Sequence, residues 1–174
     1  MKKVKNVDFL KEQIQILYEG EIEISEELKL LRLGPMTDEL QSFLSGAYNE
    51  NQIAIESLTK IVHHLGVKIK ETSNRTVQNI IREINSVIEN NKGNKKAIQT
   101  LISIYYHTLT RFQVDAYGSA IMNAATIPDF ITTQFLHECL NNKKEIKSKI
   151  QLLEEKLVRR RIKGSISILQ PAYV

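Results

Sequence analysis

The stretch TRFQVDAYGSA (Thr110–Ala120) lies at the centre of a segment, Ile98–Ala125, that predicts one long helix. Apolar residues recur in this segment in alternating steps of four and three, which places them on one face of a helix: Ile98, Ile102, Tyr105, Leu109, Phe112 and Ala116. Such a stripe is typical of the inner seam of a helical bundle. Polar residues stand beside the seam in mid-helix, where a bundle interior holds either packing or a site: Thr110, Arg111, Gln113 and Asp115.

The composition of the chain favours helices. Its 174 residues suffice for one domain with one substantial core. The shares of hydrophobic residues (42%) and charged residues (25%) are close to the averages for globular proteins, which argues against disorder. Only 7 Gly and 3 Pro interrupt the chain, which favours a few long helices over many short strands. We therefore predict a single all-α domain.

The same spacing predicts a first long helix, which Asp8 can cap and which ends at Gly34 and Pro35. Glu21 falls on its otherwise apolar seam. A lone carboxylate in that position is costly unless it is paired, protonated or bound to a metal ion. The seam consists of Leu10, Ile14, Leu17, Glu21, Ile24, Leu28 and Leu31.

A second long helix is predicted to end at Gly66. The middle of its seam is small and polar, and Glu50 lies beside Asn51 at about the depth of Glu21 if the two helices are antiparallel. The seam consists of Leu40, Leu44, Ala47, Asn51, Ala54, Leu58, Ile61 and Leu65. A shorter helix, Thr76–Asn90, follows.

The last helix begins near Pro128, which suits a first turn. Its predicted seam consists of Phe135, Cys139, Asn142, Ile146, Ile150, Leu153 and Leu157. Asn142 is again a polar residue on a seam. The opposite face is expected to be mostly solvated and holds Lys143, Lys144, Lys147, Lys149, Glu154, Glu155 and Lys156.

The two ends differ from the helical part. Residues 1–7 are predicted to form a flexible basic arm, residues 8–163 the bundle, and residues 164–174 a tail. The alternation of serine and isoleucine at 165–168 allows either a short strand or a tail laid over a groove. Arg159, Arg160 and Arg161 could touch phosphates, but consecutive residues point around a helix, so nucleic acid is not the expected partner.

The cysteine count and the hydropathy of the sequence indicate in which cellular compartment the protein is expected. Cys139 is the only cysteine, so the chain can form neither an internal disulfide nor a cysteine-based zinc site. A reducing cytoplasm is the natural compartment. The sequence has no apolar run of about 20 residues, so no association with a membrane is expected.

Four segments together resemble the YciE/YciF-type family of bacterial ferritin-like proteins, which is linked to stress and has no known function. They are LYEGE at 17–21, the run from Glu50 to Gly66, TVQNIIREINSVIE at 76–89, and above all AYGSA at 116–120. Their order and spacing are also similar to those of the family, over about residues 8–157. The resemblance implies a ferritin-like four-helix bundle with an added short helix between the second and third long helices, commonly a homodimer, with carboxylates and histidines for a two-metal centre.

This sequence departs from the metal-binding pattern that the resemblance implies. Glu21 and Glu50 match family glutamates, but Ala47 and Asn49 stand where a histidine and a glutamate are expected. Thr110, Arg111 and Gln113 replace the glutamate, histidine and glutamate of the central helix, and Asn141, Asn142 and Lys143 replace an acidic run in the last helix. Cations repel metal ions, so two carboxylates beside arginine or lysine would hold two divalent ions poorly.

Two interpretations of the bundle interior follow. The favoured one is a polar core layer of Glu21, Glu50, Gln113, Asn142 and Arg111, with no intact metal site, no catalytic residue and no cofactor. The alternative is a residual site for iron or manganese at Glu21 and Glu50, with His107 nearby, in an oxidase or a peroxide-handling protein. The first predicts a non-catalytic, stress-related homodimer, and whether the chain is an enzyme stays open at this point.

Overall fold

The computed structural model describes residues 2–34, 36–70 and 74–168 of the chain. All secondary structure in these ranges is helical, and the predicted all-α fold is confirmed. Four helices are long and one is short: α1 (Lys2–Leu31), α2 (Asp38–Leu65), α3 (Arg75–Asn90), α4 (Lys95–Ala124) and α5 (Phe130–Ile168).

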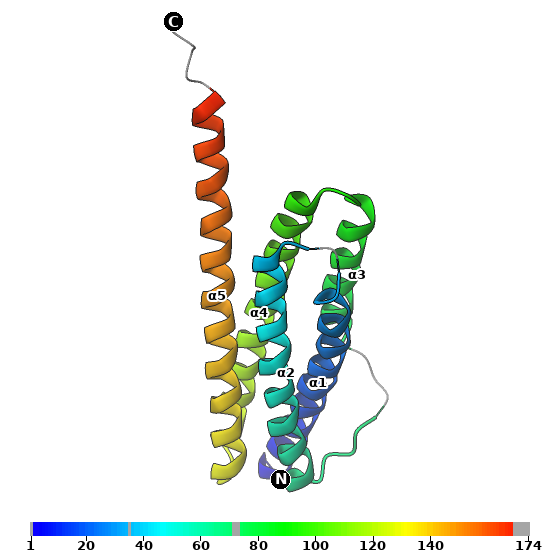
Figure 1. Ribbon diagram of the computed structural model, residues 1–174. Coiled ribbons are helices and arrows are strands. Elements are labelled where there is room, and N and C mark those ends of the chain that lie inside the picture. The colour runs from blue at the N-terminus through cyan, green and yellow to red at the C-terminus, as the bar shows by residue number, and fades with distance from the viewer. Residues whose placement is uncertain (1, 35, 71–73, 169–174) are drawn as a thin grey trace, which may run out of the picture.

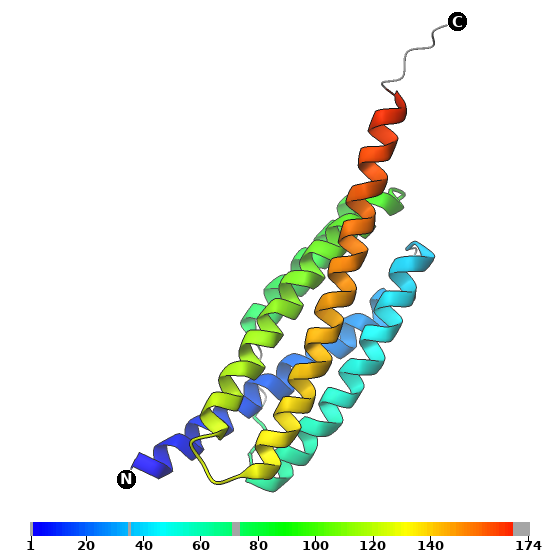
Figure 2. The same ribbon diagram turned by 90° about the vertical axis from the view of Figure 1, so that its left-hand side faces the viewer.

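The long helices form a four-helix bundle, with α3 added between α2 and α4 in the chain. α1 and α2 run antiparallel, and so do α4 and α5 (Figure 1). α1 also contacts α4, and α2 contacts α5, so that α1 and α5 occupy diagonal corners of the bundle. The short helix α3 packs on α4 and α1. α5 is the longest helix, and its C-terminal part projects beyond the bundle (Figures 1 and 2).

The helix ends have local causes. The Thr37 hydroxyl accepts a hydrogen bond from the Leu40 amide at 3.4 Å and so caps the start of α2. Gly66 ends α2 in the left-handed conformation, at φ 61°, and its amide donates to the carbonyls of the last turn. Asn74 and Asn94 cap α3 and α4 in the same way as Thr37.

The predicted seams of α1 and α2 match the buried residues almost one for one. Every seam residue of α1 is buried, and only Leu65 of the α2 seam is partly exposed. In α4 the prediction is correct at Ile98, Ile102 and Leu109, and it is wrong at three other positions, where the buried residue is the next one along the chain. Tyr106, Gln113 and Tyr117 are buried, whereas the predicted Tyr105, Phe112 and Ala116 are only half-buried.

The two ends of the helical region differ from the prediction. α1 already includes residues 2–7, which were expected to form an arm. α5 includes residues 165–168, so these form neither a strand nor a separate tail. Residues 169–174 and the side chains of residues 2–5 and 160–168 lie outside the described part of the structure.

The core consists of two apolar clusters. One cluster is built from residues such as Ile24, Leu44 and Ile146, next to α3. The other fills the opposite end of the bundle and includes Ile14, Leu58 and Leu136. The seam of α1 passes from the second cluster to the first at Glu21, so a buried polar layer lies between them.

Polar contacts attach α3 to α1. Gln78 Nε2 donates to Glu23 Oε1 at 3.0 Å, and Asn85 Nδ2 donates to Glu27 Oε2 at 3.3 Å. The other oxygens of these two carboxylates are buried and have no hydrogen-bond partner in the described part of the chain. Burial raises the pKa of Glu23 and of Glu27 above the usual value, and the amide hydrogen bonds only partly oppose this rise.

None of the described helices combines the length and the apolar character that crossing a lipid bilayer requires.

Candidate functional site: a buried carboxylate and lysine

One carboxylate, Glu21, gathers hydrogen-bond donors from every other long helix. Its Oε1 accepts from Gln113 Nε2 and from the Tyr117 hydroxyl of α4, both at 2.9 Å. Its Oε2 accepts from Lys143 Nζ of α5 at 2.7 Å and from Asn51 Nδ2 of α2. Glu21, Asn51, Gln113, Tyr117 and Lys143, all buried, are called the Glu21 cluster below.

Lys143 is the unexpected member of this cluster. Its side chain is 2% exposed, as is that of Glu21, so the two charges form an ion pair that is almost shielded from water. Lys143 lies four residues after Cys139 and three before Ile146, both buried, and so falls on the inner seam of α5. The predicted seam residue Asn142 is instead half-buried, because the buried face of α5 passes one residue further along the chain.

The surroundings of Glu21 keep the neighbouring groups protonated. Burial, followed by the nearby Glu21 carboxylate, raises the pKa of Tyr117 well above its usual range and raises that of Tyr106 as well. Burial raises the pKa of Cys139 to about 11, with Glu21 adding to the rise and Lys143 opposing it. Tyr117 is therefore a phenol that donates to Glu21, and Cys139 is an unreactive thiol at neutral pH.

Three residues of the predicted polar layer lie outside the Glu21 cluster. Arg111 is exposed, which corrects its placement in the core, because α4 turns this position toward solvent. Glu50 and Asn142 are half-buried at the edges of α2 and α5. Of the predicted layer, the structure brings together Glu21 and Gln113, and it adds Asn51, Tyr117 and Lys143.

The other candidate residues make contacts within or between helices and lie outside the Glu21 cluster. His107 Nδ1 lies 2.8 Å from Glu154 Oε2, which ties α4 to α5 away from Glu21. The Thr110 hydroxyl donates to the Tyr106 carbonyl of its own helix at 2.8 Å. Arg159 is exposed and lies 3.6 Å from Glu155 of the same helix, whereas the side chains of Arg160 and Arg161 lie outside the described residues.

The Glu21 cluster does not suit a centre of two divalent metal ions. Such a centre needs several carboxylate or imidazole ligands, and this cluster offers one carboxylate, two amides, one phenol and one ammonium. In the described ranges, no three His, Cys, Asp or Glu side chains lie close enough to hold one ion together. The Lys143 ammonium already neutralises Glu21 and would repel a metal ion.

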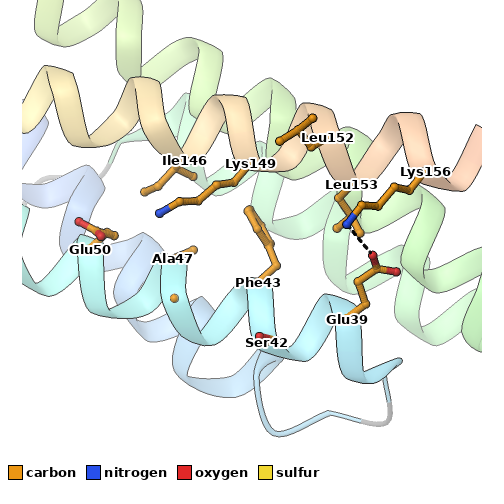
Figure 3. A pocket seen from close by; sticks show the side chains of 11 residues that line it. Glu39, Ser42, Phe43, Ala47, Glu50, Ile146, Lys149, Leu152, Leu153 and Lys156 are labelled. Carbon is orange, nitrogen blue, oxygen red and sulfur yellow. Dashed lines mark hydrogen bonds and ion pairs between the residues drawn. The ribbon is translucent and has the colours of Figure 1, made fainter.

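Glu50 lines a surface groove between α2 and α5, with a volume of about 370 Å³. Phe43, Ala47 and Leu153 contribute apolar surface, and the Lys149 side chain extends along the groove toward Glu50 (Figure 3). Lys156 Nζ lies 3.5 Å from Glu39 Oε1 at the other end. This groove is a feature of the surface and lies apart from the buried Glu21 cluster.

The sequence contained a direct signal for Glu21 but only an indirect one for Lys143, which stands in the stretch where the family resemblance implies an acidic run. A carboxylate on an apolar seam requires a partner, and that reasoning identified Glu21. Lys143 stands in the run NNKKEIKSK, Asn141–Lys149, whose lysines are typical of a solvated face. Its partner is 122 residues away in the chain, so no local pattern indicates the pair.

Two solved structures share the fold of this chain. The E. coli stress protein YciF has a TM-score of 0.81 with 19% sequence identity, over 87% of this chain and 96% of that one. YcfI, a putative structural protein from Rhodopseudomonas palustris, has a TM-score of 0.76 with 21% identity, over 83% of this chain and 91% of that one. At such identities the likeness shows the fold alone. No curated protein matches the chain.

The profile of one protein family matches residues 6–163, nearly the whole described chain. That family is described only as a domain of unknown function (DUF892). The match includes all four segments that resemble the YciE/YciF-type proteins, and this resemblance is confirmed. The chain therefore belongs to the DUF892 family.

Proposed function

We propose that this protein is a non-catalytic ferritin-like bundle in which the Lys143 ammonium replaces metal ions as the cation of the core. In this proposal the protein is a cytoplasmic homodimer that acts through its surface in a stress-related role. The observation that carries it is the buried pair of Glu21 and Lys143, with Lys143 Nζ 2.7 Å from Glu21 Oε2.

The chemistry of the Glu21 cluster supports the absence of catalysis. The four donors around Glu21 occupy both oxygens of its carboxylate. A substrate or an oxidant would have to displace Lys143 and leave a buried charge without a partner, which is costly. The stress-related part of the proposal is supported only by the fold shared with YciF, which is described as a stress protein.

Metal analysis of the purified protein tests this proposal. The protein should be purified without a chelator from cells that are supplied with iron and manganese, together with a known di-iron protein as a control for metal supply. We expect far less than one metal ion per chain, because the only cluster carboxylate is already neutralised by Lys143.

A protein that contains bound metal would contradict the proposal. Roughly one or two equivalents of iron or manganese per chain would contradict the proposal if they are lost in Glu21→Ala. That result would support the alternative of an oxidase or peroxide-handling protein that uses Glu21 and Glu50.

A further inference from the structure

We infer that the outward face of α5 pairs with the same face of a second copy, in antiparallel orientation, about a two-fold axis that passes next to Leu152. The inference rests on the homodimer of the proposed function and specifies its interface. An isologous interface must be complementary to itself, so its residues can be tested for that property one by one.

The face is a continuous exposed stripe on α5. Glu145, Lys149, Leu152, Lys156 and Arg159 follow one another in steps of four, three, four and three, and all are exposed. Leu152, at the centre, is 58% exposed, although α5 buries Ile150 and Leu153 next to it. Leu152 is thus the one apolar residue of this stripe, and the complementarity of the face has to come mainly from its charges.

The charges of the stripe become complementary about Leu152 when its exposed neighbours Ser148 and Glu155 are included. In an antiparallel pair with its axis at Leu152, residues equally far from Leu152 on the two helices face each other. Lys149 then faces Glu155 of the second copy, and Glu145 faces Arg159. Each pairing occurs twice because of the symmetry. Lys156 faces Ser148, so this register sets no like charges against each other among the described residues of the stripe.

Neighbouring registers lack this complementarity. Moving the axis by one turn toward the N-terminus places Lys149 on the axis, where it would face its own copy. Moving it by one turn toward the C-terminus does the same for Lys156. Like charges in direct opposition are unfavourable, so the register centred on Leu152 is favoured over these two shifted registers.

The shape of the molecule permits this pairing. α3 covers the α1–α4 side, whereas α5 occupies the diagonal corner and lies in front of both α4 and α2 in Figure 2. Both flanks of α5 are hollow. The groove between α2 and α5 lies on one side, and a hollow of about 260 Å³, which includes the exposed Ile104 and Val158, lies on the other. A second α5 would cover apolar surface on these flanks.

The length of α5 agrees with the same register. The helix continues for 16 residues beyond Leu152, to Ile168, which corresponds to about 24 Å. It extends even further from Leu152 toward its N-terminus at Phe130. In the inferred dimer the projecting end of each α5 therefore lies alongside the bundle of the second copy.

A charge exchange tests the inference. Lys149→Glu places two carboxylates against Glu155 and should weaken the dimer by about tenfold, because two attractive contacts become repulsive. Combining Lys149→Glu with Glu155→Lys restores opposite charges across the axis and should restore the dimer. Lys29→Glu, an equal charge change at an exposed position of α1, should have no effect. Sedimentation velocity over a concentration series measures all four proteins.

The possible outcomes separate this inference from the proposed function. If Lys149→Glu leaves the dimer unchanged, or if the double variant does not restore it, the α5 interface is wrong but the dimer stands. A monomer at all concentrations overturns both the dimer and the interface, and it leaves the metal-free core intact. Circular dichroism should show unchanged helicity, because the substituted residues are exposed.

Discussion

A buried lysine is stable only where its ammonium has a partner, and the acidic partner of Lys143 is Glu21. The carboxylate in turn depends on Lys143 as the only charged group among its four donors. Removing either charge therefore leaves the other buried without compensation. Such a loss is far larger than the net stabilisation that the intact pair provides.

Substitution of Lys143 tests this dependence. We expect Lys143→Met to lower the free energy of unfolding by about 3–5 kcal/mol, the usual effect of leaving a buried charge unpaired. Lys144→Met is the matched control, because Lys144 is exposed on the same helix, and its effect should stay within about 0.5 kcal/mol. Urea unfolding followed by circular dichroism measures both.

The double variant separates lost charge from lost packing. Glu21→Gln combined with Lys143→Met leaves no charge in the Glu21 cluster and keeps an acceptor for Gln113 and Tyr117. It should therefore be more stable than Lys143→Met alone. If the losses of the two single variants simply add, the ion pair is not the source of the effect.

Of the two residues in the buried ion pair, only Glu21 was expected in the core from the sequence. Glu21 could be predicted because a carboxylate interrupts an apolar seam that is otherwise regular. The family resemblance placed Lys143 in the stretch of an acidic run, but helical spacing did not predict its burial, because steps of three or four after Cys139 both continue the seam and the choice fell on the neutral Asn142. The deciding factor is the contact between Lys143 and Glu21 across the bundle, and local spacing contains no information about it.

Among the helices, α3 has a distinctly polar attachment to its neighbour α1. Glu23 and Glu27 of α1 lie against the amides of Gln78 and Asn85, and one buried oxygen of each carboxylate lacks a partner within the described ranges. In both groups burial raises the pKa in the folded state. Folding therefore favours their protonated forms.

The pH dependence of stability follows from the direction of these shifts. A carboxyl group with a raised pKa in the folded state contributes most below its unfolded pKa, near 4.5, and loses this contribution as the pH rises through the folded pKa. We expect Glu27→Gln to raise the unfolding midpoint at pH 7 and to flatten the decline above pH 4.5. Glu26→Gln, at an exposed position, is the control.

Thermal unfolding from pH 4 to pH 8 checks this expectation. A Glu27→Gln variant that is less stable than the original protein at pH 7 would show that the Asn85 contact outweighs the burial of the charge.

The helices themselves largely followed from the sequence, apart from the outer ends of α1 and α5 and a one-residue shift of the buried face in parts of α4 and α5. Adjacent tyrosines at 105 and 106 offer the same chemistry to either face, so a seam extended from Ile102 could continue through either one. Contact with Phe43 decides the outcome, because the rings of Tyr106 and Phe43 pack edge to face at 5.4 Å. The resemblance of AYGSA to its family also identified the helix correctly but did not determine its inward face.

For the molecule as a whole, the proposed internal cation predicts that stability does not depend on the metal supply. A ligand that binds only the folded state raises the unfolding midpoint with its concentration. Because Lys143 already occupies the cation position beside Glu21, we expect neither EDTA nor added manganese to change this midpoint by more than about one degree.

Differential scanning fluorimetry with and without EDTA checks this expectation. A known di-iron bundle, treated in parallel, should lose stability with the chelator. A clear drop in the midpoint of the present protein would contradict the proposed metal-free core.

The Glu21 cluster also has a consequence for the folding kinetics of the chain. The partners of Glu21 lie 30, 92, 96 and 122 positions away, so the cluster is complete only after the last helix has docked. Interactions that form late are absent from the folding transition state, and their loss accelerates unfolding while leaving the folding rate almost unchanged. The buried pair thus controls how long the folded bundle persists more than how fast it forms.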